Sequence, residues 1–223
     1  MNFPILSTII FLPLLGSIFI LVSRGNNFNS SAYIAILTSL ANFFLSLLAW
    51  YLFDNSISDF QFVEESSWIS GLITFKLGVD GISILFIVLT AFITPICIIS
   101  CINSVKERVK EFLLAILILE TFMIGVFCSL DLVVFYIFFE AGLIPMFLII
   151  GVWGGPKRVY AAFKFFLYTL LGSVLMLVAI ISIYWITGTT DILQIYETKI
   201  PKEYQYFLWL AFFSSFAVKT PMW

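Results

Sequence analysis

Charged residues are scarce in this chain, and histidine is absent. Lys, Arg, Asp and Glu make up 11% of the 223 residues and the net charge is −2, whereas soluble domains carry about 25% charged residues. A chain without a basic region is a poor partner for nucleic acid. Cys97, Cys101 and Cys128 include no C-x-x-C pair, and no glycine-rich nucleotide motif is present. We therefore expect this chain to bind no metal, cluster or nucleotide cofactor.

Apolar residues are in excess. They account for 62% of the chain, with 26 phenylalanines and a mean hydropathy of +1.12, against about 45–50% apolar residues in soluble domains. A water-soluble fold of this size has too little interior to bury so much apolar surface. The composition therefore predicts an integral membrane protein surrounded by lipid.

Apolar segments of membrane-spanning length recur along the whole chain. A helix needs about 20 mainly apolar residues to cross a bilayer. Seven segments meet this requirement: 3–23, 32–53, 82–103, 112–130, 132–153, 160–187 and 205–223. The first segment lacks the basic start of a signal peptide, so we expect it to be retained as a span. The sequence thus predicts an all-α polytopic membrane protein of about seven transmembrane helices.

The spans divide the chain into four parts. These are 1–53 with two helices, 54–81 as an outer loop, 82–111 with the third helix and a basic loop, and 112–223. In the loop, Phe75, Leu77 and Val79 alternate with other residues after a turn-like Ser70–Gly71, which predicts a short β-hairpin. A short interfacial helix is expected within 189–197.

Two aspartates precede predicted helices. Asp80 stands before the third span and Asp131 before the fifth. Aspartate is a favoured N-cap residue because its carboxylate accepts bonds from free backbone N–H groups of the first turn. We expect both aspartates to act as helix caps.

Lysine and arginine are unevenly divided between the two sides of the predicted bundle. One side carries six of them (Arg24, Lys106, Arg108, Lys110, Lys157, Arg158) and the other carries three (Lys76, Lys199, Lys202). The basic side of a membrane protein usually faces the cytoplasm or matrix. We therefore expect the N-terminus outside, in a bacterial inner membrane or alternatively in the mitochondrial inner membrane.

Three charged residues lie deep inside predicted spans, away from the span ends: Glu120, Glu140 and Lys219. Each costs at least about 2.5–3.5 kcal/mol near the bilayer centre unless it faces protein or water. The two glutamates lie ten residues before and after the corner at Leu130, which is about 15 Å along each helix. Pro145 and Pro221 interrupt the helix beside Glu140 and Lys219. An acid and an amine at this depth, beside broken helices, are typical of a proton carrier.

Structural interpretations of these residues remain open. Glu120 could be a protonated carboxyl group bonded to a neighbouring helix, and Glu140 with Lys219 could form a buried ion pair without a transport role. Lys164 lies near the start of the sixth span, where its side chain can reach the interface. It is a possible further member of a proton relay.

Four stretches resemble a known family. They are L-G-V-D-G-I-S-I-L-F (77–86), residues 123–155, Y-A-A-F-K-F-F-L-Y-T (160–169) and F-A-V-K-T-P-M-W (216–223). The most specific part of the second stretch is F-F-E-A-G-L-I-P-M (138–146). They resemble the proton-translocating antiporter-like membrane subunits of respiratory NADH–quinone oxidoreductase. The resemblance implies an inverted-repeat fold of about fourteen helices, of which this sequence holds the first part and ends inside the seventh.

The resemblance also implies roles. Glu140 matches the fifth-helix glutamate and Lys219 the lysine of the broken seventh helix, a pair assigned to proton transfer in that family. Glu120 and Lys164 stand at positions that are polar in the family. NADH, FMN, iron–sulfur clusters and quinone are expected in other subunits, and the partners are neighbouring membrane-arm subunits. The alternatives are a multi-subunit cation/proton antiporter, a hydrogenase-type membrane complex, or an inert structural scaffold.

Overall fold

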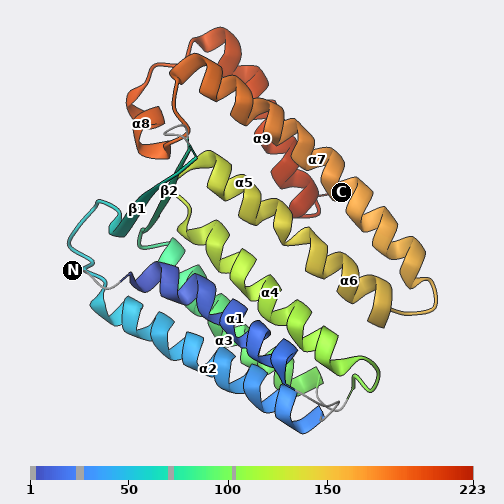
Figure 1. Ribbon diagram of the computed structural model, residues 1–223. Helices are drawn as coiled ribbons and strands as arrows, with labels where there is room; N and C mark the ends of the chain where they lie inside the picture. Colours follow the sequence, from blue (N-terminus) through green and yellow to red (C-terminus); the bar gives the residue numbers. More distant parts are fainter. Residues whose placement is uncertain (1–3, 24–27, 70–72, 102–103, 223) are drawn as a thin grey trace. The chain divides into compact units, whose positions relative to one another are not determined.

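The computed structural model describes residues 4–23, 28–69, 73–101 and 104–222. By its contacts the chain forms two compact units (Figure 1). Unit 1 consists of residues 1–64 and 77–128, and unit 2 of residues 65–76 and 129–223. The two units are described separately below. The predicted division of the chain into four parts stays a prediction.

Unit 1 is a bundle of four helices. They are α1 (Ile5–Val22), α2 (Phe28–Leu52), α3 (Ser83–Cys101) and α4 (Val109–Cys128). Helix α1 packs against α2 and α4, and α3 packs against α2 and α4 (Figure 1). A cluster that includes Ile20, Ala35, Ile98 and Leu117 fills the interior. A side chain at Gly16 would collide with Thr38, so glycine permits α1 and α2 to lie close together.

Helix α1 obtains its N-terminal cap from a distant residue. Pro4 precedes the helix and has no side-chain acceptor. The carboxylate of Glu64 instead accepts bonds from the N–H groups of Leu6 (2.8 Å) and Ser7 (3.0 Å) and from the Ser7 hydroxyl. A carboxylate here also stabilises the positive end of the helix dipole. The predicted cap at Asp80 is confirmed, because its carboxylate accepts the N–H of Ser83 at 2.7 Å.

Unit 2 contains five helices within its described residues. They are α5 (Leu132–Ala141), α6 (Leu143–Trp153), α7 (Arg158–Thr187), α8 (Ile192–Glu197) and α9 (Lys202–Lys219). The long helix α7 packs along both α9 and α6 (Figure 1). Helix α8 is the short helix expected within 189–197, and Asp191 caps it by accepting the N–H of Leu193 at 2.8 Å.

The segment between α2 and α3 forms a two-stranded sheet. Strands β1 (Gln61–Ile69) and β2 (Ile73–Val79) pair as the predicted hairpin. The boundary between the units passes through both strands. The predicted turn at Ser70–Gly71 lies outside the described residues.

The fifth predicted span is a broken helix. It is continuous from Leu132 to Ala141 and again from Leu143 to Trp153, with Gly142 between the two parts. Pro145 explains the interruption, because its nitrogen has no hydrogen for the carbonyl of Ala141 and its ring crowds the preceding turn. The break that Pro145 predicted is therefore confirmed.

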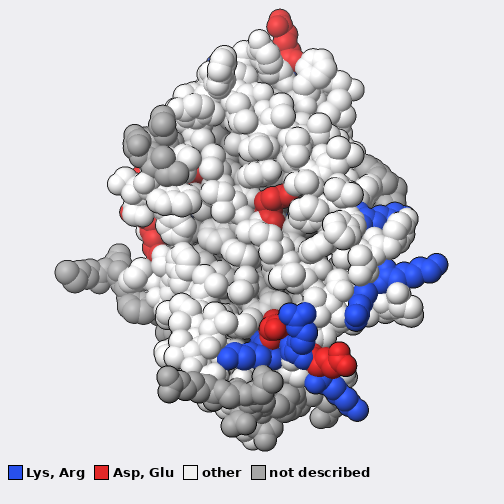
Figure 2. Space-filling model, turned by 45° about the vertical axis from the view of Figure 1, so that its right-hand side comes forward, with Lys and Arg blue, Asp and Glu red and all other residues white. Residues whose placement is uncertain are grey.

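Six described helices are long and apolar enough to cross a membrane: Ile5–Val22, Ser30–Leu52, Ser83–Cys101, Val109–Cys128, Leu132–Trp153 and Arg158–Thr187. The face drawn in Figure 2 accordingly shows mostly uncharged surface. The chain is thus a multi-pass helical membrane protein. Helix α9 lies where the seventh span was expected, but it begins with polar residues at Lys202 and also carries Lys219. Its passage through the membrane stays a prediction.

Candidate proton-transfer site

Glu140 lies directly before the break between α5 and α6. Both oxygens of its carboxylate are buried, and neither has a hydrogen-bond partner among the described residues. Backbone bonding is also irregular here, since the Gly142 N–H bonds to the carbonyls of Phe138 and Glu140. Pro145 supplies no donor for the next turn. The sequence thus places the buried carboxylate of Glu140 beside Pro145, which cannot donate a backbone hydrogen bond to the carbonyl of Ala141.

Lys219 reaches the same turn of α5 from the last turn of α9. Its ammonium donates a hydrogen bond to the carbonyl of Phe139 at 3.0 Å, and Phe139 immediately precedes Glu140. The ammonium also lies 3.8 Å from the centroid of the Phe139 ring, a favourable cation–π contact. The structure therefore places Lys219 against the backbone of the residue that precedes Glu140, and the relay role of the two residues stays a prediction. In the part of the chain described, no ion pair joins them within 4 Å.

Phenylalanines from α5 and α9 surround this lysine contact. The ring of Phe139 lies 5.6 Å from that of Phe135 and 6.1 Å from that of Phe216, measured between centroids. Phe212 stacks on Phe216 in turn. Rings of this size exclude water, and charges interact more strongly where water is excluded. The Lys219 ammonium is therefore sensitive to the charge on Glu140.

Helix α7 closes the third side of this site. A side chain at Gly172 would lie 3.1 Å from Val218, so glycine allows α7 to pack directly on α9 beside Lys219. One turn before Lys219, the hydroxyl of Ser215 is buried without a partner among the described residues. Buried polar groups without partners are uncommon, and such groups often bind ordered water. Glu140 and Ser215 thus give the site a polar interior.

Glu120 belongs to unit 1 and is 2% exposed on α4. Its Oε1 accepts a hydrogen bond from Nδ2 of Asn42 on α2 at 2.8 Å. The structural interpretation that placed Glu120 against a neighbouring helix is in accord with this contact. Because Glu120 and Glu140 lie in different units, their predicted equal depth stays a prediction.

Lys164 is exposed on the surface of α7. Its ammonium lies 6.0 Å from the centroid of the Tyr160 ring, one turn earlier on the same helix. This position suits a side chain that extends toward the interface. A role of Lys164 in proton transfer stays a prediction.

A buried ion pair that the sequence analysis missed lies in unit 2. Lys76 of β2 is 9% exposed, and its ammonium lies 2.5 Å from Oδ2 of Asp191 and 3.7 Å from Oε2 of Glu65. Burial lowers the pKa of Lys76, but the hydrogen bond and charge of Asp191, with the charge of Glu65, outweigh burial and raise it above its ordinary value. Lys76 therefore remains an ammonium ion across the physiological range.

The ion pair is connected to the N-terminal cap of α5, because Asp191 follows Thr190, which bonds to the capping residue Asp131. Asp131 accepts the N–H groups of Val133 (2.8 Å) and Val134 (3.1 Å), which confirms the predicted cap, and its other oxygen accepts the Thr190 hydroxyl at 2.5 Å. Backbone bonds join Leu132 to Thr190 and Ile192 to Leu130, each at 2.9 Å. We call Glu65, Lys76, Asp131, Thr190 and Asp191 the hairpin clasp. It ties the hairpin to the first turns of α5 and α8.

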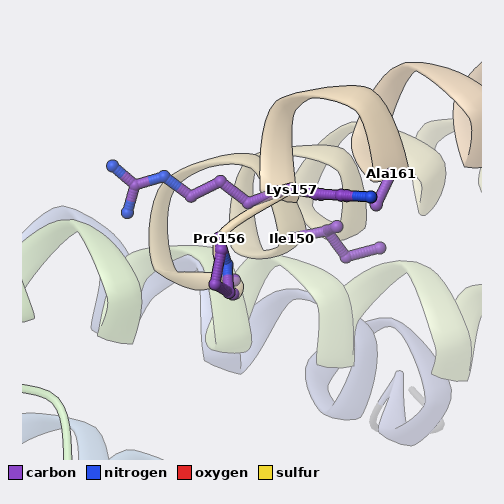
Figure 3. Close-up of a pocket in the computed structure, with 7 residues that line it drawn as sticks. Ile150, Pro156, Lys157 and Ala161 are labelled. Carbon is purple, nitrogen blue, oxygen red and sulfur yellow. The ribbon is translucent and has the colours of Figure 1, made fainter.

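A surface cavity of about 440 Å³ lies at the connection between α6 and α7. Figure 3 shows that Ile150, Pro156, Lys157 and Ala161 line it. The guanidinium of Arg158 donates to the carbonyl of Val152 at 2.6 Å and so closes the turn. This cavity belongs to the basic connection rather than to the buried acid and amine.

Acidic and basic side chains near a broken helix inside a multi-pass helical bundle are typical of the class of ion-translocating membrane proteins. Residues 129–223 match the family described as NADH:quinone oxidoreductase/Mrp antiporter, TM. Over these residues the match confirms the resemblance that the sequence motifs indicated.

Two curated proteins and one solved structure resemble nearly the whole chain. The chain is 51% identical to NADH-ubiquinone oxidoreductase chain 4 of Marchantia polymorpha over 97% of its length. It is also 51% identical to NADH-quinone oxidoreductase subunit M of Rhodobacter capsulatus over 98% of its length. It superposes on a chain of respiratory complex I from Thermus thermophilus with a TM-score of 0.84, 28% identity and 97% coverage. It spans 44–46% of the length of these three proteins.

Proposed function

We propose that this chain forms part of a proton-translocating membrane subunit of NADH–quinone oxidoreductase. The relatives reported above carry that name or come from respiratory complex I. One observation carries the proposal. The Lys219 ammonium donates to the backbone carbonyl next to Glu140, while both Glu140 oxygens are buried without a hydrogen-bond partner in the described part of the chain. This arrangement leaves both groups able to gain or lose a proton.

The proposed mechanism is electrostatic. An ionised Glu140 stabilises the ammonium form of Lys219, and a neutral Glu140 removes that stabilisation and favours proton release. Because the two groups are close without being locked in a direct ion pair, a charge change nearby can shift the balance between them. Lys219 then passes its proton along buried polar groups such as Ser215 and water bound to them.

The energy for this step comes from outside the chain. Moving one charge against 100 mV costs about 2.3 kcal/mol, and we propose that NADH-to-quinone electron transfer in other subunits supplies it. NADH, FMN, iron–sulfur clusters and quinone would bind in those subunits. This chain would hold no redox centre of its own. The direct partners would be neighbouring antiporter-like subunits of the membrane arm. We place the complex in a bacterial inner membrane, with the N-terminus of this chain outside.

The alternative is a multi-subunit cation/proton antiporter, because the matched family also includes the Mrp antiporter. The complete protein in its complex, reconstituted in liposomes with pH-sensitive and Na⁺-sensitive dyes, separates the two. We expect NADH and quinone together to drive proton movement. Na⁺ movement that follows an imposed pH gradient, without any proton movement on NADH oxidation, would support the antiporter and overturn the proposal.

A further inference from the structure

Asn42 and Glu120 form an isolated polar pair inside unit 1. Asn42 on α2 is 0% exposed and Glu120 on α4 is 2% exposed. Nδ2 of Asn42 donates a hydrogen bond to Oε1 of Glu120 at 2.8 Å. Each side chain also has one buried oxygen that finds no partner among the residues the structure describes. These oxygens are Oδ1 of Asn42 and Oε2 of Glu120.

Both unpaired atoms are acceptors while Glu120 is ionised. An amide oxygen never donates, and a carboxylate has no hydrogen to donate. A proton on Oε2 of Glu120 changes this, because a protonated carboxyl group has one O–H donor. A primary amide and a carboxylic acid can then form two hydrogen bonds side by side. Nδ2 of Asn42 donates to Oε1 of Glu120, and the O–H on Oε2 of Glu120 donates to Oδ1 of Asn42. One proton would thus satisfy both unpaired oxygens.

The described residues of the helices packed on α4 supply no counter-charge for an ionised Glu120. Among described residues, the titratable groups of α1, α2 and α3 are Tyr33, Tyr51, Cys97 and Cys101, and α4 itself adds Lys110, Glu111 and Cys128. Lys110 is the one cation among them. It lies ten residues from Glu120, about 15 Å along the helix, and its ammonium donates to the carbonyls of Leu21 and Ser23.

Electrostatics therefore favours the neutral acid. An ionised carboxylate buried in an apolar interior without a paired cation costs several kcal/mol. The protonated form avoids this cost and also removes the two unpaired acceptors. Geometry and charge thus point to the same protonation state.

We propose that Glu120 and Asn42 form a proton-binding site, in which the Asn42 amide holds Glu120 as a neutral carboxylic acid. Asn42 is then a positioning residue, because it retains the proton through the paired bonds rather than exchanging one itself. Glu120 releases its proton only when the pair opens. The site is defined within unit 1 and does not depend on the role proposed for Glu140 and Lys219.

Infrared difference spectroscopy of the complete protein in its complex tests this site. At neutral pH, the wild type minus Glu120→Gln spectrum should contain the C=O stretch of a protonated carboxylic acid, with the small downshift that exchange into D₂O produces. In Asn42→Leu, this band should move to the higher frequency of a carboxyl group that lacks strong hydrogen bonds. Asn42→Ala provides a second variant if the leucine is not accommodated.

Ser39→Ala is the matched control. Ser39 is 0% exposed and lies one turn before Asn42 on the same helix, and its hydroxyl donates to the carbonyl of Ile36 on its own helix. The carboxylic acid band should be unchanged in this variant. A carboxylate signal from Glu120 in the wild type would mean that water rather than a proton occupies the site, and would overturn the proposal. An acid band that does not respond to Asn42→Leu or Asn42→Ala would equally overturn the role of Asn42.

Discussion

Replacing Glu140 with Gln should reduce the rate of proton transfer through this subunit by about 10²-fold or more, the range for loss of a group that exchanges protons. The substitution preserves the shape of the side chain but removes its negative charge and its ability to bind and release a proton. Lys219 stays on the Phe139 carbonyl but loses the nearby charge that would control its proton. The measurement is dye-monitored proton translocation by the complex in liposomes.

Glu140→Asp is the matched variant for this test. It shortens the side chain but keeps a carboxylate at the break between α5 and α6, so we expect partial activity. Assembly of the complex and NADH oxidation by the solubilised enzyme serve as controls for folding. Proton translocation at the wild-type level in Glu140→Gln would show that Glu140 has no part in the transfer.

Asp191→Asn should destabilise the folded protein by about 3 kcal/mol. Lys76 is 9% exposed and depends on Asp191, 2.5 Å away, for its counter-charge. Removing one partner of a buried ion pair leaves the other charge without compensation, which typically costs about 3–5 kcal/mol. Asp191 also caps α8, so part of the loss comes from that helix. Equilibrium unfolding in detergent micelles measures the difference in the free energy of unfolding.

Glu65→Gln is the control for Asp191→Asn. The Glu65 side chain is 55% exposed and lies 3.7 Å from the ammonium of Lys76, and exposed pairs contribute about 0–1 kcal/mol. Because the pKa of Lys76 is raised above 10.5, its contribution to stability is complete below that pH and is lost as the pH rises beyond it. Equal effects of Asp191→Asn and Glu65→Gln would contradict the assignment of Asp191 as the main partner.

Features encoded by local sequence were predictable. Long apolar runs identify membrane helices because lipid requires each span to satisfy its own backbone groups. The caps at Asp80 and Asp131 and the interruption before Pro145 also follow from neighbouring residues. Glu140 and Lys219 stood out because a charge in an apolar run is costly wherever the helix lies.

Partners far apart in the sequence were not predictable. Asn42 and Glu120 are 78 residues apart and Lys76 and Asp191 are 115 apart, and no local pattern specifies such pairs. Lys76 was counted as a loop cation because its position after a turn resembles that of a solvated lysine. Glu64 falls in the predicted outer loop 54–81, and nothing near it in the sequence indicates that it caps α1 from 58 residues away. Only the packing of the helices determines which polar groups meet.

Lys219→Arg tests the central claim most directly. Arginine keeps the positive charge and can still donate to the Phe139 carbonyl, but its guanidinium does not lose a proton in proteins. The measurement is the number of protons translocated per NADH oxidised by the assembled complex. If Lys219 exchanges protons with its surroundings, translocation should fall to the level of Lys219→Met. Translocation at the wild-type level in Lys219→Arg would show that only the charge at this position matters, and would contradict proton transfer through Lys219.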